Sequence, residues 1–453
     1  MAPGGGCSSC TSFEVDPPLA KKGVPCRGRS GRSSGRYTRQ SLYSFTPAFG
    51  SDKRDDPMIL RGCRSVLFGI ALTVLLGCGN SGSSSPSSPS GPSGPNVLAI
   101  TIDPSSAAVC TFANGLCTQV TICEPSTSHC QTIADVLVDT GSSGLRIFAS
   151  KVTITLPSSS LGECMYFGGG TEWGRVHTVD VVLGGEPAVL VPIHVIDPTF
   201  AGQYTSAGQP ASNICGVALV DSSPSQVGFN GIFGVGLFRF DGGFYYNCAS
   251  LPCTAVAVAP SQQIQNPVGL LPVDNNGVIV ALTSVPAGGS PSLKGSLILG
   301  IGTESNNQPS GVTVLPTNSL GQIVTRFHPS PGISTQNVGI IDSGSSVIFF
   351  SDSSLSIPLC PGNLSFLYCP ASPLNFSAVN TESSGSPSSL VSFQIVDPRP
   401  LLNSGNAAIS NIGGPTFSTG VFDWGVPFFL GRTVYVGLSG KTSVLGTGPF
   451  GAY

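Results

Sequence analysis

One short acidic motif occurs twice in the sequence, and its two copies start 203 positions apart. The first copy reads Asp-Thr-Gly-Ser-Ser at residues 139–143, and the second reads Asp-Ser-Gly-Ser-Ser at residues 342–346. Each copy follows an apolar run that is typical of a buried strand. Two carboxylates on matching turns therefore predict a pseudo-symmetric site to which two lobes each contribute one aspartate.

The chemistry that suits such a pair is hydrolysis by a water molecule held between Asp139 and Asp342. Two carboxyl groups a few ångströms apart share one proton, because both cannot ionise easily. The ionised group can act as a general base on water, while the protonated group polarises a substrate carbonyl. We assign the two aspartates as catalytic, and the residues expected to orient them are Thr140, Gly141, Ser142, Ser343, Gly344 and Ser345.

The remaining sequence is typical of an all-β protein. Charged residues make up only 9% of the 453 residues, and glycine (59) and proline (38) are frequent. The apolar runs are short and are separated by turn residues, which favours many strands over helices. Residues 119–123 and 131–138 are expected to form a hairpin that ends at Asp139, and residues 295–300 a further strand.

Each half also contains a later apolar segment that is interrupted by glycine. The segment at 231–236 can pack where two backbones approach closely. Its expected counterpart in the second half is the segment at 426–431. The repeated plan predicts an N-terminal lobe at residues 96–282 and a C-terminal lobe at residues 283–453.

The basic residues are concentrated near the N-terminus. Residues 1–78 contain 11 of the 20 lysines and arginines, so the remaining chain has nine basic and 18 acidic residues. This balance gives no basic surface for nucleic acid, and no nucleic-acid partner is expected. A monomer is expected.

Residues 58–78 read as a signal peptide. Arg61 and Arg64 precede an apolar run at 66–76, which is too short for a confident transmembrane helix. The run ends in Leu-Leu-Gly-Cys78, which resembles a bacterial lipobox, where the cysteine is lipidated. The alternative is an ordinary signal peptide that contains a cysteine. Residues 1–57 are either an over-extended start or a disordered leader, and residues 79–95 form a flexible Ser/Pro/Gly linker.

These features predict an exported protein of the bacterial cell envelope. It would be attached through its lipid only, with the outer membrane mildly preferred, or it would be secreted. Ten cysteines follow Cys78, and an even number in an exported chain favours disulfides. Four pairs are close in sequence and one pair remains: Cys110–Cys117, Cys123–Cys130, Cys248–Cys253, Cys360–Cys369, and Cys164–Cys215. Because the spacings match no zinc pattern, neither a metal nor a cofactor is expected.

Residues 138–146 and 341–346 resemble the two active-site signatures of pepsin-like aspartic peptidases. The resemblance extends over roughly residues 97–453, and the pattern with its lipobox is closest to bacterial pepsin-like lipoproteins. It implies a bilobal, pepsin-like acid protease fold in which two pseudo-symmetric β-barrel-like lobes flank a central cleft. The implied activity is that of an aspartic endopeptidase, with a polypeptide as its substrate. The alternative is a catalytically silent protein that binds peptide or cell-envelope material in the same cleft.

The same resemblance implies a flap over the cleft. Residues 167–174 are similar to the family's flap hairpin, and we assign to substrate binding the residues Tyr166, Phe167, Gly168, Gly169, Gly170 and Thr171. Residues 231–236 and 428–431 resemble the apolar-apolar-Gly elements that complete the two psi-shaped loops of the family.

Two positions depart from the family pattern. Phe167 stands where the family usually has a flap tyrosine, and Arg146 stands where it usually has that tyrosine's tryptophan partner. Arg146 is interpreted either as a cation–π partner of Phe167, Tyr166 or Trp173, or as a solvated surface residue. His177 is interpreted as an ordinary strand histidine.

Overall fold

The computed structural model describes residues 92–204, 208, 215, 220–416 and 418–453. The predicted leader, the signal segment with Cys78 and the linker up to residue 91 lie outside these residues. The described chain is mostly β, and its α-helices are short: α1 (Pro224–Val227), α2 (Pro398–Asn403) and α3 (Val426–Phe429). Short 3-10 helices lie at Ala149–Lys151, Phe200–Gly202, Pro260–Gln262, Pro267–Leu270 and Gly362–Leu364. The all-β prediction is thus confirmed, and no described helix is both long and apolar enough to cross a membrane.

The N-terminal half contains a closed barrel. Its strands hydrogen-bond in the order β2-β3-β8-β4-β7-β6, and β6 pairs back onto β2. Valines at alternate positions of β6, such as Val179 and Val181, are fully buried inside it. The bounds are β2 (Cys117–Cys123), β3 (Cys130–Asp139), β4 (Ser143–Phe148), β6 (Thr171–Val182), β7 (Val189–Ile196) and β8 (Gly231–Val235).

The flap hairpin extends from this barrel. β5 (Leu161–Tyr166) pairs with β6, and the backbone N–H of Phe167 donates to Gly170 O at 2.8 Å across the turn. β9 (Phe244–Asn247) and β10 (Thr254–Ala255) continue the sheet beyond β5. The predicted flap residues therefore form the β5–β6 turn and its two flanks.

The C-terminal half contains a seven-stranded sheet with an aromatic core. The strand order is β18-β17-β14-β15-β20-β16-β19. Phe422 stacks on Phe350 with ring centroids 5.4 Å apart and packs against Trp424 at 4.4 Å. The bounds are β14 (Ile323–His328), β15 (Thr335–Ile341), β16 (Ile348–Phe350), β17 (Leu374–Thr381), β18 (Ser388–Ile395), β19 (Gly413–Gly414) and β20 (Val421–Trp424).

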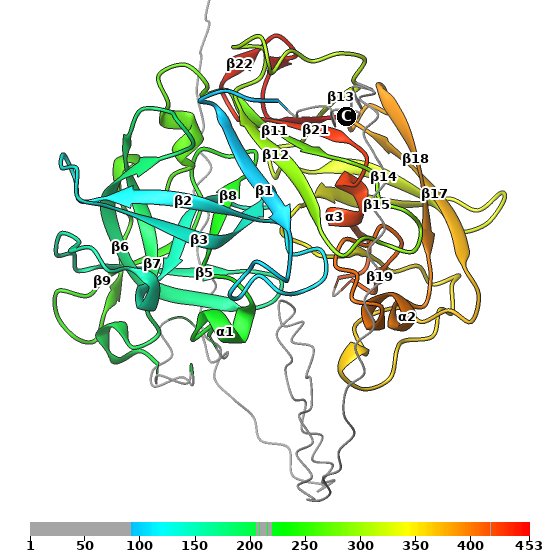
Figure 1. Ribbon diagram of the computed structural model, residues 1–453, viewed down its shortest axis with the longest axis horizontal. Coiled ribbons are helices and arrows are strands. Elements are labelled where there is room, and N and C mark those ends of the chain that lie inside the picture. The colour runs from blue at the N-terminus through cyan, green and yellow to red at the C-terminus, as the bar shows by residue number, and fades with distance from the viewer. Residues whose placement is uncertain (1–91, 205–207, 209–214, 216–219, 417) are drawn as a thin grey trace, which may run out of the picture. The chain divides into compact units, whose positions relative to one another are not determined.

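A run of antiparallel strands continues from the N-terminal barrel (Figure 1). It follows the order β1-β12-β11-β21-β24-β13, and β1 joins it to β2. The predicted lobe boundary at residue 283 falls directly after β11. The bounds are β1 (Val97–Ile102), β11 (Gly277–Leu282), β12 (Leu293–Leu299), β13 (Val314–Pro316), β21 (Thr433–Gly437) and β24 (Phe450–Ala452), and a separate hairpin joins β22 (Thr442–Ser443) and β23 (Gly446–Thr447).

The same psi-shaped crossing occurs in both halves. β8 pairs in parallel with β3 on one side and antiparallel with β4 on the other. β20 likewise pairs in parallel with β15 and antiparallel with β16. In each half the chain leaves the first strand, makes its Asp-Gly-Ser turn and returns across the crossing strand. This doubled crossing is the bilobal, pepsin-like arrangement that the sequence predicts.

The prediction that residues 426–431 form the crossing element of the second half is wrong. Residues 426–429 form α3, and Pro427 suits the first turn of a helix because it lacks an N–H. The crossing strand is β20, which ends at Trp424. Its register matches that of β8, since Trp424 pairs with Ile341 as Phe233 pairs with Val138. The sequence pattern concealed this strand because Asp423 occupies one of the apolar positions.

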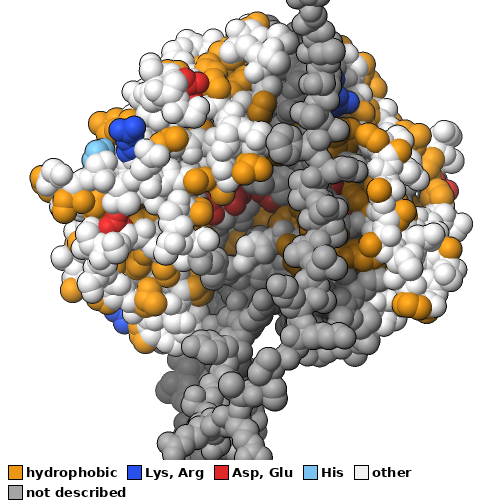
Figure 2. Space-filling view, turned by 180° about the vertical axis from the view of Figure 1, so that it is seen from behind, with side chains coloured by type: hydrophobic (Ala, Val, Ile, Leu, Met, Phe, Trp, Pro, Cys, Tyr) orange, Lys and Arg blue, Asp and Glu red, His pale blue; other side chains and the backbone are white. Residues whose placement is uncertain are grey.

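Disulfides join all ten described cysteines in the five expected pairs. This density of disulfides indicates a protein that folds outside the cytoplasm. Cys360 and Cys369 also approach Asp397, but both sulfurs belong to one disulfide, so no thiolate is free there to bind a metal. On the face shown in Figure 2 charged side chains are few and scattered, and acidic side chains are visible in the central hollow.

Candidate active site

The two Asp-Gly-Ser turns are cross-linked by reciprocal hydrogen bonds. The backbone N–H of Ser343 donates to Thr140 Oγ1 at 2.9 Å, and the N–H of Thr140 donates to Ser343 Oγ at 3.1 Å. The Thr140 hydroxyl also donates to the Ile341 carbonyl, directly before Asp342. The Ser343 hydroxyl donates to the Val138 carbonyl, directly before Asp139. Thr140 and Ser343 therefore hold the two turns together, and their hydroxyl hydrogens are directed to these carbonyls rather than to the carboxylates.

The carboxylates themselves are held in matching ways. Asp139 accepts hydrogen bonds from the Gly141 N–H at 2.7 Å and from Ser142 Oγ at 2.5 Å. Asp342 accepts from the Gly344 N–H at 2.7 Å and from Ser345 Oγ at 2.9 Å. Each aspartate thus receives one backbone and one hydroxyl donor from its own turn, and this arrangement favours the ionised form of either group.

The two carboxylates meet because glycine follows each of them two positions later. A Cβ atom at Gly141 would lie 2.7 Å from Asp342 Oδ1, and one at Gly344 would lie 2.7 Å from Asp139 Oδ1. No other residue type leaves this space free. Burial, followed by the charges of Asp139 and Asp423 and a side-chain hydrogen bond with Asp139, raises the pKa of Asp342 well above its usual value.

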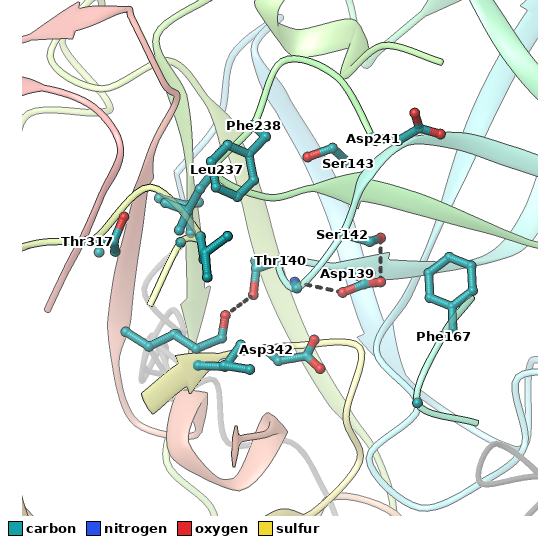
Figure 3. Close-up of a pocket in the computed structure, with 18 of the residues that line it drawn as sticks. Asp139, Thr140, Ser142, Ser143, Phe167, Leu237, Phe238, Asp241, Thr317 and Asp342 are labelled. Carbon is teal, nitrogen blue, oxygen red and sulfur yellow. Dashed lines mark hydrogen bonds between the residues drawn. The ribbon is translucent and has the colours of Figure 1, made fainter. Parts of the chain in front are cut away.

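Two cavities flank the pair of aspartates. The first, of about 290 Å³, is lined by both carboxylates and by apolar side chains, with Phe167 on one side of Asp139 and Leu237 and Phe238 on the other (Figure 3). The second, of about 280 Å³, is lined by Asp342 and Asp423. Gly168 of the flap lines both. A chain segment lying along these cavities would pass over the carboxylates and beneath the flap.

The predicted flap residues divide into a tip and a base. Phe167 and Gly168 line the first cavity, Gly168 and Gly169 line the second, and a Cβ atom added at Gly168 would meet no other atom within 4 Å. At the base, Gly170 packs so closely on the buried Asp221 that a Cβ there would lie 2.5 Å from its carboxylate. The other two predicted flap residues are Thr171, which is buried, and Tyr166, which lines the first cavity while its side chain remains 49% exposed.

Arg146 is buried, so its interpretation as a solvated surface residue is wrong. Its side chain has no exposed surface, and its guanidinium lies 5.4 Å from the ring centroid of Phe167, which is the alternative cation–π contact. A buried arginine needs compensating groups. Arg146 has the Ser143 carbonyl oxygen at 2.9 Å and the carboxylates of Asp241 at 2.6 Å, Glu163 at 3.3 Å and Glu172 at 3.6 Å.

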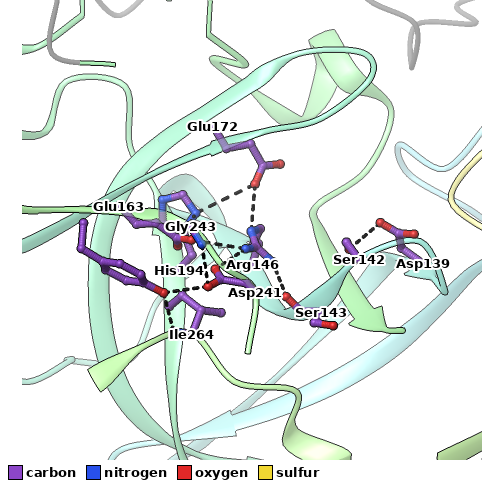
Figure 4. A network of polar contacts seen from close by, with 11 residues as sticks. Asp139, Ser142, Ser143, Arg146, Glu163, Glu172, His194, Asp241, Gly243 and Ile264 are labelled. Atoms are coloured by element: carbon purple, nitrogen blue, oxygen red, sulfur yellow. Dashed lines mark hydrogen bonds and ion pairs between the residues drawn. The ribbon is translucent and has the colours of Figure 1, made fainter. Parts of the chain in front are cut away.

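This buried ionic cluster joins the flap strands to the wall of the site (Figure 4). Glu163 lies on β5, Glu172 on β6 and His194 on β7, while Asp241 lines the first cavity. His194 Nδ1 is 3.3 Å from Glu163. Burial raises the pKa of Glu172 to about 8 despite the opposing charge of Arg146, and burial lowers the pKa of His194 well below its usual value. We conclude that this cluster carries fewer charges than its residue types suggest.

The partners of Arg146 were not predicted from the sequence. A signal was available, because Glu163 and His194 each interrupt a strand that is otherwise apolar. A single titratable residue at an inward position of such a strand needs a buried partner. His177, in contrast, lies on β6 with Nδ1 2.8 Å from Pro157 O and is not among the residues lining either cavity, as expected of an ordinary strand histidine.

The fold and its site define a protein of the pepsin-like fold with two aspartates facing a shared cavity. The chain belongs to the DUF3443 family, described as a protein of unknown function, whose model matches residues 92–453. Among solved structures, it is similar to the aspartic proteinase from Irpex lacteus, with 16% sequence identity and a TM-score of 0.43. That likeness covers 79% of this chain and 96% of the fungal chain. No curated protein sequence matches the chain significantly.

Proposed function

We propose that this protein is an exported aspartic endopeptidase in which Asp139 and Asp342 form the catalytic dyad. The observation that carries the proposal is the meeting of these two carboxylates at one cavity, each with the same pair of donors from its own turn. Carboxyl groups in this relationship hold one proton between them. One of them is then a base and the other an acid at the same pH.

Burial, which raises the pKa of Asp342, favours Asp342 as the carboxyl group that holds the shared proton in the free enzyme. Asp139 is then the general base that takes a proton from the bound water as its oxygen attacks the peptide carbonyl carbon. Asp342 donates its proton to the carbonyl oxygen, giving a neutral tetrahedral diol. Asp139 then gives the proton taken from water to the peptide nitrogen as the C–N bond breaks. One hydroxyl of the diol returns its proton to Asp342, which leaves a carboxylic acid and an amine and restores the dyad.

The cavities support an extended polypeptide as the substrate. The apolar side chains of Phe167, Leu237 and Phe238, which line the first cavity, suit an apolar side chain of the substrate beside the dyad. The lipid on Cys78 and the linker after it would hold the enzyme, as a monomer, at a bacterial membrane. We place it at the outer membrane or, without the lipid, in the secreted fraction.

Cleavage of an unfolded protein between about pH 3 and 7 tests the proposal. The full-length protein should release peptides in a pepstatin-sensitive reaction, and Asp139→Asn and Asp342→Asn should each reduce kcat by at least about 10³-fold, because a dyad member cannot be replaced by an amide. The matched control is Asp274→Asn, which removes a buried aspartate that accepts from Thr303 and lines neither cavity. It should retain activity.

A silent binding protein would give a different result. Peptide retained equally by the wild-type protein and by Asp342→Asn, with no products in mass spectrometry, would overturn the peptidase proposal. It would favour binding of peptide or cell-envelope material in the same cleft.

A further inference from the structure

The Ser345 hydroxyl lies between two carboxylates. Its Oγ is 2.9 Å from Asp342 Oδ2 and 2.7 Å from Asp423 Oδ2. The matching hydroxyl of the other half, that of Ser142, donates to Asp139 at 2.5 Å, and no second carboxylate shares it among the described residues. The two halves of the site therefore differ at one point: the serine beside Asp342 is shared with a third acid.

The difference originates in the crossing strands. Asp423 on β20 pairs with Ile340, two residues before Asp342. The equivalent position on β8 is Ile232, which pairs with Leu137, two residues before Asp139. An apolar residue fills this position in the N-terminal half, whereas the C-terminal half places a carboxylate there.

The hydrogen atoms available to Ser345 constrain the protonation of its neighbours. A serine hydroxyl carries one hydrogen, so it can donate to only one of its two acceptors. For both contacts to be hydrogen bonds, either Asp342 or Asp423 must be protonated and donate to Ser345 Oγ. The arrangement of Asp342, Ser345 and Asp423 therefore holds at least one proton.

The surroundings of Asp423 favour such a proton. Burial raises the pKa of Asp423 to about 7, with the charge of Asp139 adding to the effect and the hydrogen bond from Ser345 opposing it. The groups facing it are Asp342 at the end of β15 and Asp139 at the end of β3. The neighbouring β16 and α3 carry no charged residue, and the described residues include no salt bridge to Asp423. Its Oδ1 is buried without a hydrogen-bond partner in the described part of the chain.

We propose that Asp423 is a positioning residue that acts through Ser345 to set where, and up to what pH, the proton of the Asp139–Asp342 pair is held. The proposal rests on the proposed peptidase function. While Asp423 is neutral, it donates to Ser345, which donates to Asp342 and so favours the ionised form of that carboxyl group. When Asp423 ionises, Ser345 turns its hydrogen to Asp423, and Asp342 loses a donor and gains a negative neighbour. Both changes make Asp342 retain its proton, so the dyad stays monoprotonated to a higher pH.

The test is the pH profile of kcat for the wild-type protein and Asp423→Asn. Asparagine keeps the shape of the side chain and can donate to Ser345, but it cannot ionise. The basic limb of the profile should move to lower pH by roughly one unit, as expected when a like charge next to a carboxyl group is removed. The readout is the position of the limb and not the maximal rate, because Asp423 also lines the second cavity.

Further variants separate this role from a structural one. Asp423→Ile introduces the residue type of the other half and should shift the basic limb in the same direction. In a Ser345→Ala background, Asp423→Asn should shift it less than in the wild-type background. Asp274→Asn should leave the profile unchanged. A basic limb that stays in place in both Asp423 variants, or a loss of rate that is equal at every pH, would overturn the proposal.

A measurement without turnover keeps this inference distinct from the peptidase proposal. Aspartate labelled with ¹³C at the carboxyl carbon reports protonation by NMR in the full-length protein. A carboxyl resonance that is lost in Asp342→Asn should titrate at higher pH in the wild-type protein than in Asp423→Asn. If the protein cleaves nothing, the peptidase proposal fails while this titration still decides the role of Asp423. Identical titrations in the two proteins would refute that role.

Discussion

Arg146 Nη2 lies 2.6 Å from Asp241 Oδ2, and neither side chain is exposed to solvent. Arg146 belongs to β4, which begins directly after the Asp139 turn, and Asp241 lines the first cavity. Glu163 and Glu172 add one carboxylate from each strand of the flap hairpin. A single cation therefore connects the aspartate turn, the cavity wall and the base of the flap.

Replacing this cation should destabilise the protein strongly at neutral pH. Arg146→Met keeps a long apolar side chain but leaves buried carboxylates without a counter-charge, which should cost about 3–5 kcal/mol in the free energy of unfolding. The loss should be larger at about pH 9, above the pKa of about 8 of Glu172, because that carboxyl group is then ionised beside the missing cation. Urea unfolding at pH 7 and pH 9 measures both values.

The control for that experiment is an exposed ion pair. Arg399 pairs with Asp397 at 2.6 Å, but its side chain is 47% exposed, so Arg399→Met should cost less than about 1 kcal/mol. If Arg146→Met were equally mild at pH 7, the cluster would not depend on its cation.

Glu172 should make the protein less stable as the pH rises. Its folded pKa of about 8 lies above the usual glutamate value of 4.5, so the native state binds more protons than the unfolded state between these values. The free energy of unfolding therefore falls as pH increases from about 4.5 to 8, by up to about 1.4 kcal/mol per unit from this group, and levels off above pH 8. Asp221, whose pKa burial raises to about 7, acts in the same direction up to that pH.

Glu172→Gln should flatten this dependence, because glutamine has no proton to lose. Urea unfolding of the wild-type protein and the variant across pH 4.5–8 measures the two slopes. The partly exposed Glu382, mutated to Gln, is the matched control and should leave the slope as it is. Equal slopes in the wild-type protein and Glu172→Gln would show that Glu172 titrates at the same pH in the folded and in the unfolded state.

The link between Thr140 and Ser343 should appear as a coupling energy. Thr140→Val and Ser343→Ala each leave a buried backbone N–H without its acceptor, which should cost about 1–3 kcal/mol. The cost of the double variant should differ from the sum of the two by about 0.5–3 kcal/mol, because both hydroxyls belong to one hydrogen-bond network that joins the turns. Equilibrium unfolding in urea gives all three values.

An exposed pair of hydroxyl groups provides the comparison. Thr121 and Thr132 also bond to one another, at 2.7 Å, but on the surface, so Thr121→Val should cost less than about 0.5 kcal/mol. Strictly additive costs for Thr140→Val and Ser343→Ala would mean that the two turns are not held together through these hydroxyls.

Local patterns in the sequence predicted much of the fold and the candidate site. The strand that ends at Asp139 and the hairpin closed by Cys123 and Cys130 both depend on residues that are neighbours in the chain. Alternation of apolar residues and turn chemistry determine such elements directly. The duplication of the Asp-Gly-Ser motif also indicated that the two aspartates would meet.

Long-range contacts were decided only by the tertiary structure. Arg146 could be interpreted as a surface residue because its partners come from β5, β6 and a loop nearly a hundred positions away. Asp423 disrupted the apolar pattern of its strand, so the element at 426–431 was mistaken for the crossing strand. By itself, the sequence determined the two aspartates and the strands that deliver them, since short apolar periods and turns are local. The tertiary structure decided which buried charges surround them, because a charged side chain can be buried only where other parts of the chain compensate it.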